Sequence, residues 1–324
     1  MKILVIGGAG YIGSHVCLEL MDAGHEVTVF DNLSSGKHEN IFGGELFVKG
    51  DIMDEGALDS AMSKGFDGVV HLAAFKAAGE SMLLPEKYAR NNISGSINIL
   101  NAMAKNKINK IVFSSSAAVY GEPEYLPVDE KHPAKPENFY GYTKLAIENL
   151  LEWYGKLKGI RYAALRYFNA AGYDINGRVK GLESNPANLL PVIMEAAAGL
   201  RAELSIFGND YPTKDGTGIR DYVHVNDLAA AHVKAMEHLG RAEESFVVNL
   251  GSEEGLSVME MLESARRITG RDIAVKIDGR RPGDPARLIA SSGLAASILG
   301  WKAIHSSPDS LIRSSWAVYR HLLK

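Results

Sequence analysis

Cysteine is almost absent from this chain, because Cys17 is the only one among its 324 residues. A single thiol can form neither an internal disulfide nor a cysteine metal cluster, so we predict a cytoplasmic protein with no metal site. No apolar run approaches the ~18 residues that a membrane-spanning helix needs. The net charge is only −4, so no cationic surface for nucleic acid or anionic lipid is expected. These deficits leave a soluble globular protein that acts on a small molecule.

Short runs of β-branched and aromatic residues are prominent in the first half, and each is too short for a buried helix. Stretches with helical spacing separate them, for example Ile12 to Ala23 and Ile147 to Tyr154. Alternating strands and helices predict a parallel sheet with helices on both faces. We therefore predict an α/β, doubly wound (Rossmann) fold. Its expected strands are Ile3–Ile6, Glu26–Phe30, Leu46–Val48, Gly68–Leu72, Lys110–Ser114 and Tyr162–Phe168.

The second half departs from this rhythm, and the chain is longer than one hydrophobic core usually organises. Gly, Pro, Asn and Asp crowd residues 176–191 and 208–218. We predict a first domain at 1–174 and, at 175–324, mainly a second and smaller α/β domain that binds the substrate. Its expected elements are helices at 189–199, 225–239 and 258–269 and a strand at 246–250. Whether that late strand rejoins the first sheet is left open.

A glycine-rich turn follows the first predicted strand and opens a helix. It reads Gly7-Gly8-Ala9-Gly10-Tyr11-Ile12-Gly13, with glycines at positions 7, 10 and 13. A side chain at those positions would obstruct the sharp turn, the approach of a pyrophosphate to the backbone, and the packing of helix on strand. The helix N-terminus adds partial positive charge for the phosphates. The motif therefore favours dinucleotide binding over a plain structural turn.

Two acidic residues at later strand ends bear on the choice of dinucleotide. Asp31 ends the second predicted strand, where a carboxylate accepts hydrogen bonds from the adenosine ribose. Because it would repel a 2′-phosphate, we predict NAD rather than NADP. Asp51 follows the third predicted strand, where it either reads the adenine edge or caps a helix that begins near Asp54. Both interpretations of Asp51 stay open.

Three residues form a candidate catalytic group. Tyr140 and Lys144 are four residues apart, so a helix presents them on one face. A free tyrosine is a poor base because its pKa is near 10, and a nearby ammonium is expected to lower that value. Ser116, which follows the strand at 110–114, is expected to orient the reacting hydroxyl. Which serine of Ser114–Ser116 faces the substrate is not settled by the sequence.

The chain resembles the extended short-chain dehydrogenase/reductase family over nearly its whole length. The most specific stretches are Gly7–His15, Leu165–Asn169 and Ile206–Tyr222. The resemblance implies that Tyr140 is the base and that Lys144 and Ser116 support it. The cofactor contacts that it implies are Gly7, Gly10, Tyr11, Ile12, Gly13, Asp31, Asn32, Asp51, Ile52, Lys76, Asn91, Tyr140, Lys144 and Phe168. The substrate contacts that it implies are Ser116, Asn169, Asn188, Leu189, Phe207, Arg220, Arg281 and Asp284.

Within this family the likeness is greatest to the enzymes that epimerise UDP-hexoses. It implies reversible inversion at C4 of UDP-glucose and UDP-galactose through a 4-keto sugar and transient NADH, a step of galactose metabolism. Relatives that dehydrate the sugar carry an acidic pair after the serine motif, whereas Ala117 and Ala118 stand here. Leu288 occupies a position where some members have tyrosine, which keeps N-acetylated UDP-hexoses as an alternative. An NAD-dependent nucleotide-sugar dehydrogenase is a further alternative.

The family also implies a homodimer. An amphipathic helix such as the one expected from Ser94 to Asn106 has the character of a pairing surface. Composition alone does not establish this assembly.

Overall fold

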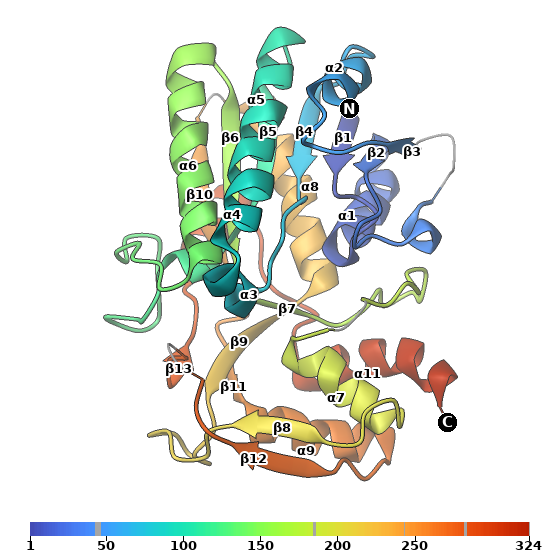
Figure 1. Ribbon diagram of the computed structural model, residues 1–324, viewed down its shortest axis with the longest axis vertical. Coiled ribbons are helices and arrows are strands. Elements are labelled where there is room, and N and C mark those ends of the chain that lie inside the picture. Colours follow the sequence, from blue (N-terminus) through green and yellow to red (C-terminus); the bar gives the residue numbers. More distant parts are fainter. Residues whose placement is uncertain (43–46, 184–185, 243, 282–283, 324) are drawn as a thin grey trace.

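The computed structural model describes residues 1–42, 47–183, 186–242, 244–281 and 284–323. Figure 1 shows a larger layered part built on a sheet and a smaller part at the opposite end of the long axis. The N-terminus lies in the larger part, and the chain ends beside the smaller one. A site at the junction of the two parts could therefore use residues from both.

The larger part contains a seven-stranded sheet in which every neighbouring pair is parallel. Its order is β10-β6-β5-β4-β1-β2-β3, so the predicted doubly wound α/β fold is confirmed. The late strand lies beside β6 and completes the sheet. The strands are β1 (Lys2–Ile6), β2 (Glu26–Asp31), β3 (Phe47–Lys49), β4 (Gly68–His71), β5 (Lys110–Ser116), β6 (Arg161–Tyr167) and β10 (Phe246–Leu250).

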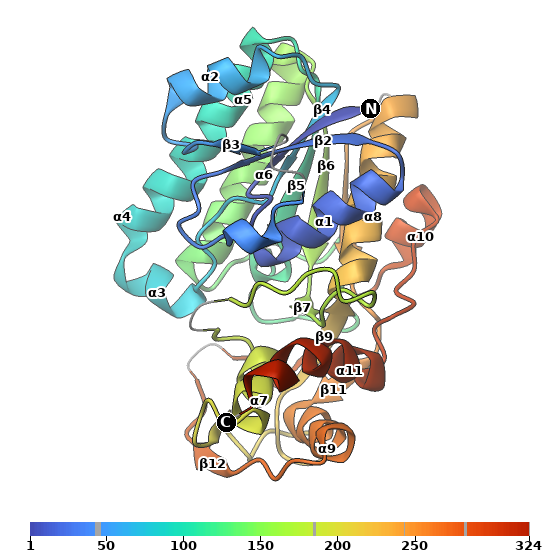
Figure 2. The same cartoon turned by 90° about the vertical axis from the view of Figure 1, so that its right-hand side faces the viewer.

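Helices cover both faces of this sheet (Figure 2). On one face α1 (Tyr11–Asp22) packs against α8 (Val225–Arg241). On the other face lie α2 (Glu55–Met62), α5 (Gly95–Lys105) and α6 (Phe139–Lys158). The helix expected from Ser94 starts earlier, as a π-helical segment, η3 (Ala89–Ser94), that runs directly into α5. Shorter elements are η1 (His38–Asn40), α3 (Ala78–Leu83), α4 (Pro85–Tyr88) and η4 (Ala117–Val119).

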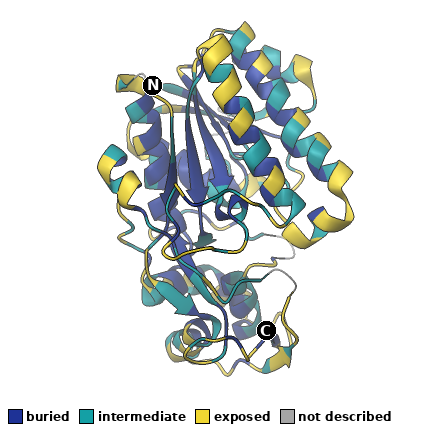
Figure 3. Ribbon diagram, turned by 90° about the vertical axis from the view of Figure 1, so that its left-hand side faces the viewer, coloured by how far each residue is buried: buried dark blue, intermediate teal, exposed yellow. Residues whose placement is uncertain are grey.

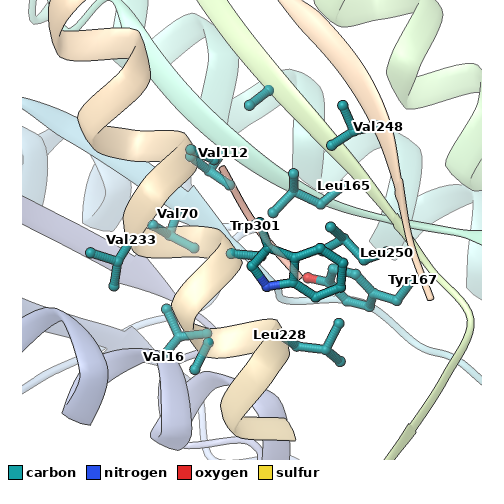
Figure 4. Packing of buried hydrophobic residues seen from close by; sticks show 14 of the residues in the cluster. Val16, Val70, Val112, Leu165, Tyr167, Leu228, Val233, Val248, Leu250 and Trp301 are labelled. Atoms are coloured by element: carbon teal, nitrogen blue, oxygen red, sulfur yellow. The ribbon is translucent and has the colours of Figure 1, made fainter. Parts of the chain in front are cut away.

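Two apolar cores sandwich the sheet, one beneath each helix layer. In the core on the α1 and α8 side, Trp301 inserts its indole among aliphatic residues of the sheet and helices (Figure 4). Its ring nitrogen donates to the carbonyl of Asp227, so the buried indole N–H is satisfied. The strands of the sheet are buried, while the outer helix faces are exposed (Figure 3). Packing between two helix layers holds the strand ends in place.

The smaller part has its own core between helices and short strands. Parallel strands β8 (Leu204–Phe207) and β12 (Val275–Asp278) lie on α7 (Leu189–Ala197), α9 (Val258–Thr269) and α11 (Pro308–Tyr319). A second small sheet crosses the junction between the two parts (Figure 1). It contains β7 (Asn169–Ala171), β9 (Ile219–His224), β11 (Gly255–Ser257) and β13 (Arg287–Leu288), and α10 (Gly293–Leu299) and η5 (Arg320–Leu322) complete the chain.

The predicted strands and helices reappear within a few residues of their expected bounds. Residue 46, the expected start of the third strand, lies outside the described residues, and β3 begins at Phe47. The strands β7, β8, β9, β11, β12 and β13 were not predicted. The division at residue 174 stays a proposal, and the return of β10 to the large sheet means that residues 175–324 are not all in the smaller part.

Candidate active site

The candidate site lies at the carboxyl ends of the parallel strands, where the order of the large sheet reverses. After β1 the chain proceeds outward through β2 and β3, and it then returns to β4 on the other side of β1. Ligands of open α/β sheets bind in the crevice that such a reversal creates. The loops after these strands carry the residues that the sequence singled out.

The glycine turn after β1 leaves room for backbone but not for side chains. A Cβ at Gly13 would lie 2.1 Å from the carbonyl oxygen of Gly7, and one at Gly7 would lie 2.6 Å from the amide nitrogen of Ala73. Gly7 also has φ +85°, which other residues rarely adopt. Gly10, the N-cap of α1, has no side chain to occupy the first-turn N–H groups. These groups fit the pyrophosphate of NAD.

Asp31 lies at the end of β2 beside this turn and is almost fully buried. Its carboxylate accepts hydrogen bonds from the backbone N–H of Ala9 at 3.0 Å and of Leu33 at 2.8 Å. Burial raises the pKa of Asp31, and these two bonds oppose the rise. The carboxylate therefore shapes the glycine turn as well as standing where a ribose would bind.

Asn32 and Asp51 are joined across the ends of β2 and β3. The Asn32 amide donates to the Asp51 carboxylate at 2.8 Å, and the other oxygen of Asp51 accepts from the backbone N–H of Met53. The alternative in which Asp51 caps the next helix is wrong, since Asp54 is the N-cap of α2 and accepts from Ala57. The proposed contact of Asp51 with the adenine edge stays a prediction.

The other proposed cofactor residues have different surroundings. Ile52 is buried and packs so closely on Gly95 of α5 that a Cβ at Gly95 would lie 2.5 Å from it. The Asn91 amide donates to Asn92, and Phe168 is buried at the step from β6 to β7. The phenol of Tyr11 donates to the Gly172 carbonyl just after β7.

Lys76 has a partner that the sequence did not predict. It is more than half exposed, and its ammonium contacts the carboxylate of Glu183 in the loop before α7. The structure therefore brings Lys76 to a second loop rather than to the strand ends that carry Asp31 and Asp51. Its proposed cofactor contact stays a proposal.

The three serines at the end of β5 point to alternate sides of the sheet, as the period of a strand requires. Ser115 points toward α6 and donates to Glu148. Ser114 contacts the phenol of Tyr167, and Ser116 contacts the phenol of Tyr140. The structure thus selects Ser116 as the serine beside the candidate base.

Tyr140 stands in the first turn of α6, and its position depends on close packing of that turn. Asn138 caps the helix by accepting from the N–H of Gly141 at 2.9 Å. The N–H of Tyr140 donates to Ser81 of α3. A Cβ at Gly141 would lie only 2.2 Å from the Ala118 carbonyl oxygen. Glycine at position 141 therefore allows Tyr140 to approach the loop that carries Ser116.

The electrostatics of the pair differ in part from the sequence-based expectation. The Lys144 amine donates to the Ser114 carbonyl at 2.6 Å and lies 5.8 Å from the centroid of the Tyr140 ring. Burial lowers the pKa of Lys144 to about 7, although the Glu148 charge opposes this. Burial raises the pKa of Tyr140, and the hydrogen bond with Ser116 partly opposes the rise. The net shift of the Tyr140 pKa is therefore upward, whereas the sequence-based expectation was a pKa lowered by the ammonium.

The proposed substrate residues form two groups in the smaller part. In the first, Arg220 on β9 donates to the carboxylate of Asp284 at 2.5 Å, and the amide of Asn169 on β7 donates to the Asp221 carbonyl. In the second, the guanidinium of Arg281 lies 3.8 Å from the centroid of the Phe207 ring at the end of β8. A cation–π contact of this kind orders an otherwise exposed arginine.

The start of α7 completes this side of the site. Asn188 is its N-cap but makes no side-chain cap bond, and Leu189 is its first residue. The first-turn N–H groups of α7 are therefore not occupied by the Asn188 side chain. Leu288 is partly buried on β13, directly paired with Arg220 on β9.

Sequence reasoning missed several residues that build the site. Gly141 and Ser81 hold the first turn of α6 in place, and no sequence pattern marked them. Glu148 and Arg166 form a buried ion pair under the serines. A signal for the pair did exist, because Arg166 interrupts an apolar strand and Glu148 follows Lys144 by one helical turn.

Two features are absent from the described part of the chain. No group of three or more His, Cys, Asp and Glu side chains within it could hold a metal ion. None of its helices has the length and apolar character to cross a membrane.

Comparisons with known proteins agree with the geometry. Residues 3–251 match the model of the NAD dependent epimerase/dehydratase family. A UDP-glucose 4-epimerase of Halalkalibacterium halodurans is 46% identical over 98% of this chain and 95% of that relative. The crystal structure of UDP-glucose 4-epimerase from Brucella ovis in complex with NAD has a TM-score of 0.96, at 44% identity, and covers 98% of each chain. The enzyme from Bifidobacterium longum in complex with NAD⁺ and UDP has a TM-score of 0.92, at 36% identity and 98% coverage of each chain.

Proposed function

The chain belongs to the NAD dependent epimerase/dehydratase family, and from this premise we propose that it interconverts UDP-glucose and UDP-galactose by inverting C4. The observation that carries the proposal is the contact of Tyr140 with Ser116 at the end of β5, in the same sheet edge as the glycine turn. This contact supports the proposal that Tyr140 is a proton acceptor beside the bound dinucleotide. The proposed place of the reaction is galactose metabolism.

Each residue of the catalytic group has a distinct task. NAD, when bound, takes a hydride from C4 and returns it. Tyr140 accepts the proton of the C4 hydroxyl, which leaves a 4-keto sugar, and Ser116 orients that hydroxyl by hydrogen bonding. Lys144, when protonated, stabilises the phenolate by its charge. Inversion follows when the hydride returns to the opposite face of the sugar.

Return to the opposite face requires the hexose to turn while the nucleotide stays fixed. Binding energy therefore belongs in the UDP, and the two groups of the smaller part suit that division. The guanidinium groups of Arg220 and Arg281 can each bind a phosphate oxygen through paired N–H groups. Phe207 offers an aromatic face for uracil. The remaining proposed contacts are Asn169, Asn188, Leu189 and Asp284.

We expect the purified protein to convert UDP-galactose into UDP-glucose with no net formation of NADH. The reason is that the hydride removed in the first half of the reaction is returned in the second. Both nucleotide sugars are measured by chromatography while the absorbance of NADH is followed. Release of NADH in proportion to substrate consumed would instead identify a nucleotide-sugar dehydrogenase.

UDP-N-acetylglucosamine is the second candidate substrate. Leu288, on the strand beside Arg220, is smaller than the tyrosine that some family members have at this position. More room near the sugar favours an N-acetyl group. The same assay with UDP-glucose and UDP-N-acetylglucosamine in competition measures this preference, and exclusive use of UDP-glucose would remove the second candidate.

Assembly as a homodimer is the last part of the proposal. On α6, Tyr142, Trp153 and Leu157 are 51%, 58% and 71% exposed, and their spacing puts them on one face. Exposed apolar stripes of this kind mark protein contacts. We expect sedimentation to show a dimer that Trp153→Glu converts into a monomer, and a monomeric unmodified chain would contradict this.

We also propose a cytoplasmic location, which the single buried thiol of Cys17 supports.

A further inference from the structure

A buried ion pair lies under the catalytic group. Glu148 follows Lys144 by one turn of α6, and Arg166 lies on β6. The guanidinium donates to both carboxylate oxygens, from Nη2 at 2.6 Å and from Nε at 2.9 Å. The two side chains are only 9% and 6% exposed. The charges are therefore fixed in a place where solvent screens them poorly.

Glu148 also holds the strand that carries the serines. Ser115 donates to Oε1 of Glu148 at 2.5 Å. Its two neighbours are the residues that the catalytic group uses, since the Ser114 carbonyl accepts from Lys144 and Ser116 contacts Tyr140. A shift of Ser115 would move both of them. The carboxylate thus reaches the catalytic group through one residue of β5.

The pair is continuous with other buried polar groups. Arg166 donates from Nη1 to the phenol oxygen of Tyr120 at 2.9 Å, and Tyr120 donates to the amide oxygen of Asn249 on β10 at 2.6 Å. Asn249 in turn donates to the Val128 carbonyl. The network therefore ties α6, β5, β6 and β10 together behind the site.

We propose that Glu148, held by Arg166, is a positioning residue: it fixes the end of β5 behind Ser116 and balances the charge beside Lys144. The proposal rests on the proposed function, because it assigns the role to the same catalytic group. A buried ion pair seldom stabilises a fold more than apolar residues of the same size would. The pair instead acts on the catalytic group through the charge of Glu148, which lies one helical turn from Lys144.

The charges around Lys144 determine the direction in which its pKa moves when Glu148 is neutralised. The negative charge of Glu148 raises the pKa of Lys144 against the lowering by burial. Neutralising Glu148 alone would remove that support and leave the Arg166 cation unbalanced. The titratable groups that surround the pair and Lys144 from the packed elements are Tyr140, His71, Tyr120, Tyr162, Tyr167 and Glu130.

The test compares Glu148→Gln with the double variant Glu148→Gln/Arg166→Gln. In the single variant the pKa of Lys144 falls, because the supporting charge of Glu148 is lost and the Arg166 cation has no carboxylate partner. We expect the pH profile of kcat to move toward acid by about one unit. In the double variant no charge is unbalanced, so the profile returns to that of the unmodified enzyme. A single variant with an unmoved profile, or a double variant that keeps the shift, would overturn the proposal.

Glu152→Gln is the matched control. Glu152 lies one turn further along α6, is exposed, and pairs with Lys156 at 2.5 Å. Removing its charge tests whether the loss of any carboxylate on α6 shifts the pH profile of kcat. We expect no shift, and an equal shift in this variant would show that Glu148 has no special place.

A second measurement covers the case in which Glu148→Gln does not fold. Glu148→Asp keeps the charge but withdraws the carboxylate from Ser115. We expect kcat to fall on the order of 10- to 100-fold through misplacement, with an unchanged pH profile. Unmodified kcat in the folded Glu148→Asp enzyme would contradict the positioning role.

A third readout separates this proposal from the proposed function. The Lys144 ammonium can be followed by ¹⁵N NMR of lysine-labelled holoenzyme and assigned with Lys144→Arg. Its titration midpoint should fall in Glu148→Gln and recover in the double variant, whatever the enzyme converts. If the unmodified enzyme does not convert UDP-galactose, the proposed function fails while this titration still decides the role of Glu148.

Discussion

Replacing Tyr140 by phenylalanine lowers turnover by at least ~10²-fold, the contribution expected of a positioned general base. The ring and its packing remain, and only the phenol oxygen that contacts Ser116 is lost. Bound NAD should be retained, since Gly7, Gly13 and Asp31 are untouched. The measurement is the conversion of UDP-galactose, together with the cofactor content after gel filtration.

Tyr142→Phe is the control for this variant. Tyr142 lies two residues further along the same helix but is 51% exposed, with no role in the catalytic group. It should keep nearly full turnover. If Tyr140→Phe were also close to fully active, the phenol of Tyr140 could not be the base and the proposed chemistry would have to be withdrawn.

The second large effect is expected from Gly141→Ala. The added methyl would lie 2.2 Å from the Ala118 carbonyl oxygen, and this atom belongs to the backbone and cannot rotate away. The first turn of α6 must therefore move, and Tyr140 moves with it. Overpacking of this kind costs about 1–3 kcal/mol of unfolding free energy. A displacement near 1 Å lowers turnover by up to ~10²-fold.

Gly240→Ala separates this local effect from a general effect of alanine in a helix. A Cβ at Gly240, in α8, would have no contact closer than 3.9 Å. The substitution should leave turnover unchanged and raise the unfolding free energy by up to about 1 kcal/mol. Thermal unfolding and steady-state assays of both variants give the comparison. Equal turnover in Gly141→Ala and the unmodified enzyme would show that close packing at Ala118 does not position Tyr140.

The large sheet was readable from the sequence because its strands are buried on both faces. Runs such as Ile3–Ile6 must be continuously apolar, and a buried parallel strand leaves no other pattern. Strands outside the large sheet are mixed in composition. Lys276 and Asp278 on β12 are ion-paired at the surface, and β9 carries Arg220 and Asp221. Their pairing is decided by contacts distant in sequence, which no local pattern records.

The sequence predicts the candidate site best where its residues lie on one element and their function requires a fixed spacing. Tyr140 and Lys144 share a helix face, and the glycines share one turn. Contacts between elements were not readable in the same way. The choice of Ser116 among three serines depends on which of them contacts Tyr140. The contact of Lys76 with Glu183 joins residues far apart in the chain. The alternative in which Asp51 caps a helix was likewise excluded only by the structure, in which Asp54 occupies the cap.

The last strand of the large sheet has a consequence for how the chain folds during synthesis. When the ribosome has released β6, the hydrogen-bonding groups on its outer edge have no partner, because β10 is made only after β7, α7, β8, β9 and α8. An unpaired strand edge is a template for association with another chain. Contacts of such large sequence separation also slow folding. The order of elements therefore leaves the nascent protein most vulnerable to aggregation just before β10, the last strand of the large sheet, emerges.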